Sequence, residues 1–215
     1  MLALFSWKPF ALPAPASAPG DTIDLAPHLT NSSLQTHRGE DEGVRLLDEL
    51  IGCHILPLEA LDLPGSDPDP TLTSGHVVNI QDQIADTLAE TFTAALQSPI
   101  HFQVRSFSRK RIDGIYSLGS PQPLPNAFEL YGVDFLVERI ASPQPQFCVK
   151  LLEFNAEPAI ELTGPRLTWA LEDLFKAVAC VCVDPFVRDI PIEAWPVGQT
   201  RHHLRKCLQT TVRGY

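Results

Sequence analysis

Three oxygen-bearing side chains lie in two short apolar runs of the sequence. Residues 128–138 carry Asp134, and residues 147–154 carry Glu153, which Asn155 follows at a spacing of two. Both runs are rich in Val, Phe, Tyr and Leu, a composition that favours β-strands. Because side chains alternate between the two faces of a strand, Glu153 and Asn155 are predicted to point the same way.

An antiparallel hairpin would bring the three side chains onto one patch of sheet. With Asp134 opposite Glu153, the register also pairs Ile140 with Phe147 and leaves residues 141–146 as the loop. Mg²⁺ takes oxygen ligands, typically one or two carboxylates together with phosphate oxygens. The alternative is that these acids lie at strand ends or on a solvated face, as isolated acids do on half-exposed sheets.

Two sequence blocks in this hairpin resemble a known family. They read ELYGVDFLV at residues 129–137 and LLEFNAEP at residues 151–158. They look like the C-terminal half of an ATP-grasp domain and, more narrowly, like the tubulin-tyrosine ligase family. In that family the Asp, Glu and Asn of these blocks bind the Mg²⁺ ions that bridge the ATP phosphates. The resemblance therefore implies that Asp134, Glu153 and Asn155 are Mg²⁺ ligands.

A third block lies earlier in the chain and reads HLTNSS at residues 28–33. From their chemistry alone, Thr30 and Asn31 are ordinary loop or N-cap residues. The block also resembles the H-L-T-N-x-S signature of the same family, in which the Thr and Asn face the nucleotide and its phosphates. The resemblance thus implies that Thr30 and Asn31 contact ATP, and the block precedes the acidic hairpin as it does in the family.

The resemblance implies a fold and a reaction. The expected fold is α/β (α+β), a partial ATP-grasp fold with a mainly antiparallel sheet and flanking helices. Residues 1–186 would form the partial domain and residues 187–215 its C-terminal extension. With ATP and Mg²⁺ as cofactors, such a ligase activates a carboxylate of a protein substrate, possibly tubulin, as an acyl phosphate. The amine of an amino acid then attacks to form an amide. No residue is identified as the general base.

The same resemblance raises an alternative function. Family members carry an adenine-binding hinge, a phosphate-binding Lys and substrate-binding Arg residues upstream of the H-L-T-N block. The opening residues 1–10 resemble a segment that lies inside the family domain, so we expect an N-terminally truncated chain with a large exposed apolar surface. Some fungal relatives join this type of domain to messenger-RNA decay bodies. The alternative is therefore a non-catalytic interaction domain that acts as a scaffold.

Composition excludes several other classes of function. The 215 residues are 44% hydrophobic and 20% charged, which is typical of a globular protein. The net charge of −10 makes nucleic acid an unlikely direct ligand. The sequence has no apolar run long enough to span a membrane. It also has no phosphate-binding P-loop, dinucleotide fingerprint or nucleophile elbow. The odd number of cysteines, five, predicts reduced thiols and a cytoplasmic location, with Cys180 and Cys182 in the core.

Hydrophobic periodicity predicts three further helices, and the basic tail is expected to form a fourth. Helices are expected over residues 43–58, 77–96 and 167–181, and a basic, solvated helix over residues 201–213. The buried stripe of the second helix is predicted to comprise Ile80, Ile84, Leu88, Phe92 and Leu96. The inward residues of the third are predicted to be Leu167, Leu171, Leu174, Phe175 and Val178.

Overall fold

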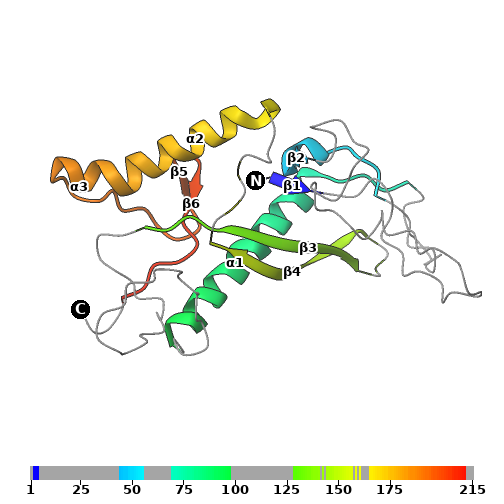
Figure 1. Cartoon of the computed structure of the whole chain (residues 1–215). Helices are drawn as coiled ribbons and strands as arrows, with labels where there is room; N and C mark the ends of the chain where they lie inside the picture. The colour runs from blue at the N-terminus through cyan, green and yellow to red at the C-terminus, as the bar shows by residue number, and fades with distance from the viewer. Residues whose placement is uncertain are drawn as a thin grey trace, which may run out of the picture. The chain divides into compact units, whose positions relative to one another are not determined.

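The computed structural model describes the backbone of Leu2–Leu4 and residues 44–55, 69–97, 128–140, 142, 144–156, 158, 160 and 165–211 (Figure 1). The chain divides into two compact units, each made of three separate stretches of sequence. The first contains Met1–Ile80, Val137–Cys148 and Ala159–Trp169, and the second contains Gln81–Leu136, Val149–Pro158 and Ala170–Tyr215. The domain boundary expected after residue 186 stays a prediction.

The first unit begins with a small antiparallel sheet. Strand β1 (Leu2–Leu4) pairs with β2 (Val44–Leu46) so that Leu2 lies opposite Leu46. A short 3₁₀ turn, η2 (Leu47–Leu50), follows directly. The helix predicted over residues 43–58 is therefore wrong. Its apolar residues fit helical spacing, but pairing with a strand some forty residues earlier decides their conformation, and a local pattern does not contain that partner.

Between η2 and the first long helix, residues 51–55 and 69–73 pair with each other. Gly52 donates its N–H to the carbonyl of Leu72 at 2.8 Å, and Leu72 donates back to Cys53 at 2.9 Å. Gly52 has a φ of 87°, a left-handed conformation that ends the helical turn and suits glycine. His54 Nδ1 lies 2.8 Å from Asp69 Oδ1 beside this pairing.

Helix α1 (Ser74–Gln97) confirms the helix predicted over residues 77–96. Thr73 caps its start, because its Oγ1 accepts the N–H of His76 at 3.2 Å. Of the predicted stripe, Ile80 and Ile84 are buried, and Leu88 and Leu96 are half-buried. Phe92 departs from it, since 39% of its surface is exposed. Buried side chains of α1 are Val77 and Ile80 in the first unit and Ile84, Ala85 and Ala95 in the second.

The predicted hairpin is present as β3 (Gly132–Ile140) and β4 (Gln146–Asn155) (Figure 1). The two strands are hydrogen-bonded neighbours in a two-stranded sheet. Only five residues separate them, close to the six-residue loop expected from the sequence. Together with the helices, these paired strands give the mixed helical and antiparallel architecture expected of an α+β chain.

A nearly continuous helical run follows the hairpin. It consists of the 3₁₀ turn η4 (Pro165–Leu167), α2 (Thr168–Val178), the π-helical turn η5 (Ala179–Val183) and α3 (Asp184–Arg188). This confirms and lengthens the helix predicted over residues 167–181. Leu167 and Ala177 are buried, but Phe175 is exposed, which corrects one inward assignment.

Two of the five cysteines lie elsewhere than predicted, and the predicted reduced state stays a prediction. None of the five forms a disulfide. Cys180 and Cys182 were expected in the core because they lie in an apolar run, yet both are exposed. An apolar run inside a helix covers both faces of the helix, and only one face of this helix is buried.

The basic tail forms a hairpin instead of the predicted helix. Strand β5 (Thr200–Arg201) pairs antiparallel with β6 (Leu204–Arg205). The intervening His202 and His203 have φ values of 49° and 61°, the positive pair that closes a two-residue hairpin. No helix in the described part of the chain is long and apolar enough to cross a membrane.

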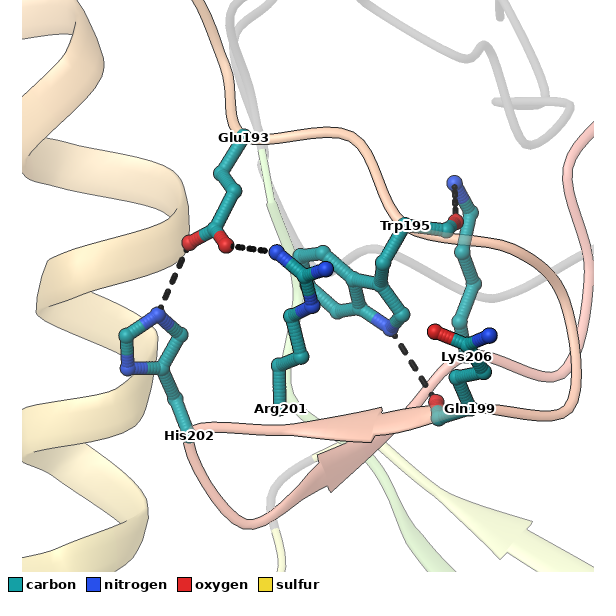
Figure 2. Close-up of polar contacts among 6 residues, drawn as sticks. All are labelled: Glu193, Trp195, Gln199, Arg201, His202 and Lys206. Carbon is teal, nitrogen blue, oxygen red and sulfur yellow. Dashed lines mark hydrogen bonds and ion pairs between the residues drawn. The ribbon is translucent and has the colours of Figure 1, made fainter.

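A network of polar contacts holds this C-terminal hairpin (Figure 2). Trp195 is buried and its Nε1 donates to the carbonyl of Gln199 at 3.1 Å. Lys206 Nζ donates to the carbonyl of Trp195 at 2.9 Å and lies 5.6 Å from the centre of its ring. Glu193 accepts from Arg201 and lies 3.0 Å from His202 Nε2. Several basic groups of the tail are thus engaged within the chain.

Candidate functional site

The hairpin brings two of the predicted ligands together in the second unit. Asn155 Nδ2 lies 3.4 Å from Asp134 Oδ2, so these side chains share one face of the sheet. Glu153 lies two residues before Asn155 in the same strand, which places it on that face as well. Asp134 and Glu153 are exposed, and Asn155 is half-buried. The three oxygen-bearing side chains therefore share one accessible face.

A close backbone approach fixes the strand end that carries Asn155. A Cβ added at Gly132 would lie 2.9 Å from the Cβ of Pro158 and 3.7 Å from the Cβ of Asn155. Real Cβ atoms do not approach each other so closely, so residue 132 has room for glycine alone. The sequence signal for this contact was present, because Gly132 and Pro158 both belong to the blocks around the acidic residues.

Aromatic rings support the strand ends beside the site. Phe154 packs edge-on against Phe92 of α1 at 5.6 Å and against Tyr131 at 6.2 Å between ring centres. Gln83 of α1 accepts the backbone N–H of Val149 through its Oε1 at 3.1 Å. Strand β4 is therefore tied to α1 by a ring contact at one end and a hydrogen bond farther along. The sequence did not indicate the role of Gln83, because nothing local marks a polar helix residue as a strand anchor.

Tyr131 also makes a polar contact at the start of β3. Its hydroxyl donates to a carboxylate oxygen of Glu129. Burial, followed by this hydrogen bond and the negative charge of Glu129, raises the pKa of Tyr131 to about 12. Tyr131 therefore stays protonated at neutral pH and keeps its hydrogen bond to Glu129.

The chemistry of the face suits a hard cation that also binds phosphate. Two carboxylates and one amide supply oxygens, and Mg²⁺ is commonly held by one or two carboxylates plus phosphate oxygens. Within the described residues there is no cluster of three or more His, Cys, Asp or Glu able to hold a metal. Asn155 presents its amide nitrogen to Asp134, so it would have to turn its amide to offer Oδ1 to a cation.

The predicted nucleotide contacts, Thr30 and Asn31, lie outside the described residues. Their role stays a prediction from the resemblance. The same holds for Asp134, Glu153 and Asn155 as metal ligands, although their shared face is now defined. The sequence predicted this arrangement through strand alternation, and it missed the close contact between Gly132 and Pro158 that positions it.

Comparison with known proteins gives matches in sequence. The model of the tubulin-tyrosine ligase family matches residues 73–191, more than half of the chain. Probable tubulin–tyrosine ligase PBY1 of Saccharomyces cerevisiae is 30% identical over 191 residues, which cover 88% of this chain and 20% of that protein. A probable tubulin–tyrosine ligase of Schizosaccharomyces pombe is 43% identical over 65 residues, 30% of this chain and 15% of that protein. No solved structure matches significantly.

The region matched by the family model includes the candidate site. It contains α1, the β3–β4 hairpin and the helical run, and therefore all three residues of the acidic face. The chain spans about a fifth of the length of the S. cerevisiae relative and less of the S. pombe one. On the extent of the family match, the chain belongs to the tubulin-tyrosine ligase family.

Proposed function

We propose that this chain forms part of an ATP- and Mg²⁺-dependent carboxylate–amine ligase that joins an amino acid to a protein. The observation that carries the proposal is the shared face of Asp134, Glu153 and Asn155, with Asn155 and Asp134 3.4 Å apart. Membership of a ligase family supports it. The substrate would be a protein carboxylate, such as one on tubulin, and the second substrate an amino acid.

In the proposed reaction the acceptor carboxylate attacks the γ-phosphorus of ATP, and ADP leaves. The amine of the amino acid then attacks the acyl carbon of the resulting acyl phosphate, and phosphate leaves as the amide forms. Mg²⁺ would supply charge neutralisation on the phosphate oxygens. The contribution of this face would be to hold negative oxygens at fixed positions, because positioning and electrostatics dominate such transfers. We further propose a cytoplasmic location.

The test uses Mn²⁺-ATP as a paramagnetic probe for the site, observed through the amide resonances of the chain. We expect localised broadening at residues 132–136 and 153–155. The method detects weak binding, which suits a chain that we expect to bind too weakly for calorimetry. Glu153→Gln keeps the shape and removes one negative charge, so binding should fall about ten- to a hundred-fold, as expected for contacts of roughly 1.5–3 kcal/mol to charged groups.

Leu152→Met provides the matched control. Leu152 is exposed on the opposite face of the same strand, and the substitution conserves volume, so the broadening pattern should not change. Broadening spread evenly over the chain, or equal binding by the Glu153→Gln variant, would refute the metal assignment.

A second candidate function is a non-catalytic interaction domain, for instance a scaffold in messenger-RNA decay bodies. One observation favours it. In the described part of the chain, more large apolar side chains are exposed than are buried. Such surfaces mark contacts with other proteins. The same experiment discriminates the two, because a purely structural domain would show no localised response to Mn²⁺-ATP.

A further inference from the structure

The apolar side of the α2–η5–α3 run is wider than the part of it that is packed. Ala177 and Pro185 are buried, and Leu171 and Leu174 are half-buried. A surface helix usually presents charged and polar residues on the side away from its core. Part of the apolar surface of this helix is therefore left uncovered, which points to a second packing partner.

The exposed apolar residues form a row along the helix. Phe175 is 47% exposed, Val183 is 39% exposed and Val187 is 72% exposed, and Ala179 continues the same four-residue spacing. Phe186, at 73%, lies next to the last member of the row. Large side chains with this much exposure, grouped on one element, are typical of an interaction surface.

A charged row runs beside the apolar row with the same spacing. It reads Glu172, Lys176, Cys180, Asp184 and Arg188. Lys176 Nζ lies 3.7 Å from Glu172 Oε2, and Arg188 lies 3.7 Å from Asp184 Oδ2. The order along the helix is acid, base, thiol, acid, base. If a second copy of this row is laid against the first after rotation by 180° about an axis through Cys180, each acid faces a base and each base faces an acid.

The π turn keeps both rows on one side of the helix. In a regular α-helix a four-residue step overshoots a full turn by about 40°, so such rows wind around the axis. A π turn closes i to i+5 hydrogen bonds and has more residues per turn, so it takes back part of that rotation. Because η5 lies in the middle of the run, the rows before and after it remain aligned.

We propose that this face, defined by the apolar and charged rows, packs antiparallel against the same face of a second copy of the chain. The two-fold axis passes near Cys180. Glu172 of one copy faces Arg188 of the other, and Lys176 faces Asp184. A two-fold interface uses the same patch on both subunits, so self-complementary charge order is what it requires. This inference does not depend on the proposed ligase activity.

The charges set the direction of packing and the apolar row supplies the attraction. Each copy carries a net charge of −10, so a face without matched pairs would be repelled by its own copy. Exposed ion pairs contribute little each, whereas burial of apolar side chains contributes more. A single helix face lies at the small end of protein interfaces. The dimer is therefore weak and depends on concentration.

The test is sedimentation velocity of the chain from roughly 1 to 200 μM, which spans the dissociation constants of weak interfaces. We expect a shift from the monomer mass of 23.7 kDa to twice that mass. Val187→Asp should raise the dissociation constant at least ten-fold. Val78→Asp is the matched control, because Val78 is a similarly exposed valine on another helix and its substitution should change nothing.

Charge reversal tests the direction of packing. Lys176→Glu places two acids opposite each other at two symmetric contacts and should weaken the dimer about three- to thirty-fold. Adding Asp184→Lys restores the contacts between copies while both pairs within the helix stay broken, so recovery identifies the partner. A bismaleimide should link two copies through Cys180, and Cys180→Ser should remove the product while Cys53→Ser retains it.

A chain that stays monomeric over the whole range overturns the proposal. Equal weakening by Val187→Asp and Val78→Asp overturns the choice of face. If adding Asp184→Lys does not restore dimerisation of the Lys176→Glu variant, the antiparallel arrangement is refuted. Because none of the substituted side chains is buried, all variants should keep the circular dichroism of the parent chain, which separates loss of association from loss of folding.

Discussion

Replacing Gly132 by alanine tests the close contact that positions the candidate site. The added Cβ would meet the Cβ of Pro158 at 2.9 Å, and Pro158 cannot move its ring carbon by changing a rotamer. The backbone of residue 132 is one that alanine can adopt, so reduced entropy of the unfolded chain favours the variant by about 0.4–1 kcal/mol. Overpacking opposes this by about 1–3 kcal/mol.

The overpacking effect is larger, so Gly132→Ala should lower the free energy of unfolding by about 1–2 kcal/mol. For a chain of this size the melting temperature should fall by roughly 2–8 °C. Urea denaturation measures the change, with an unaltered m-value as the sign that only stability has changed. The strand end should also shift, which would increase the separation of Asn155 from Asp134.

Gly75→Ala is the control with the opposite expected sign. Its Cβ would lie 3.6 Å from Thr73 Oγ1, an ordinary contact, and alanine favours a helix over glycine by up to about 1 kcal/mol. Removing the Pro158 Cβ with Pro158→Gly should rescue Gly132→Ala in a double-mutant cycle. If Gly132→Ala were as stable as Gly75→Ala, or if the cycle showed no coupling, the argument from steric contact would be refuted.

Three further predictions concern titration and turn geometry. A hydrogen bond from Arg166 lowers the pKa of Glu49, so this carboxylate stabilises the fold above its ordinary pKa of 4.5, and the stabilisation is lost as the pH falls through the lowered value. Glu49→Gln should therefore make acid denaturation less steep on the acid side of pH 4.5. His203→Gly should raise the free energy of unfolding by about 0.5–1 kcal/mol, because glycine adopts the positive φ at no steric cost; a loss of stability would contradict this. Absorbance at alkaline pH should show Tyr131 ionising near pH 12, and Glu129→Gln should lower that midpoint.

The sequence predicted those elements whose determinants are local. Helix α1 follows from an apolar stripe at four-residue steps, and the β3–β4 hairpin follows from two β-rich runs around a proline-rich loop. Alternation along β4 was enough to place Glu153 and Asn155 on one face. These predictions succeeded because hydrophobic periodicity and strand pleating act within a few residues.

The incorrect predictions each involve a partner remote in sequence or a backbone state that a pattern does not encode. Residues 44–46 pair with Leu2–Leu4, and this pairing overrides their helical spacing. The basic tail turns at His202 and His203, although hairpin turns normally use Asn or Gly. Phe175 lies on the face of an apolar helix that its own unit leaves exposed. These features depend on contacts between residues distant in sequence or on backbone angles, which a local sequence pattern does not show.

The π turn between α2 and α3 also determines where this helix can lose a residue without changing the direction of its side chains. It contains one residue more than the α turn it replaces. Losing one residue from Ala179–Val183 would restore a regular turn and leave α2 and α3 in nearly the same phase. A deletion elsewhere in α2 would rotate everything after it by about 100° and turn Phe186 and Val187 toward another side. Single-residue gaps among relatives should therefore concentrate in η5.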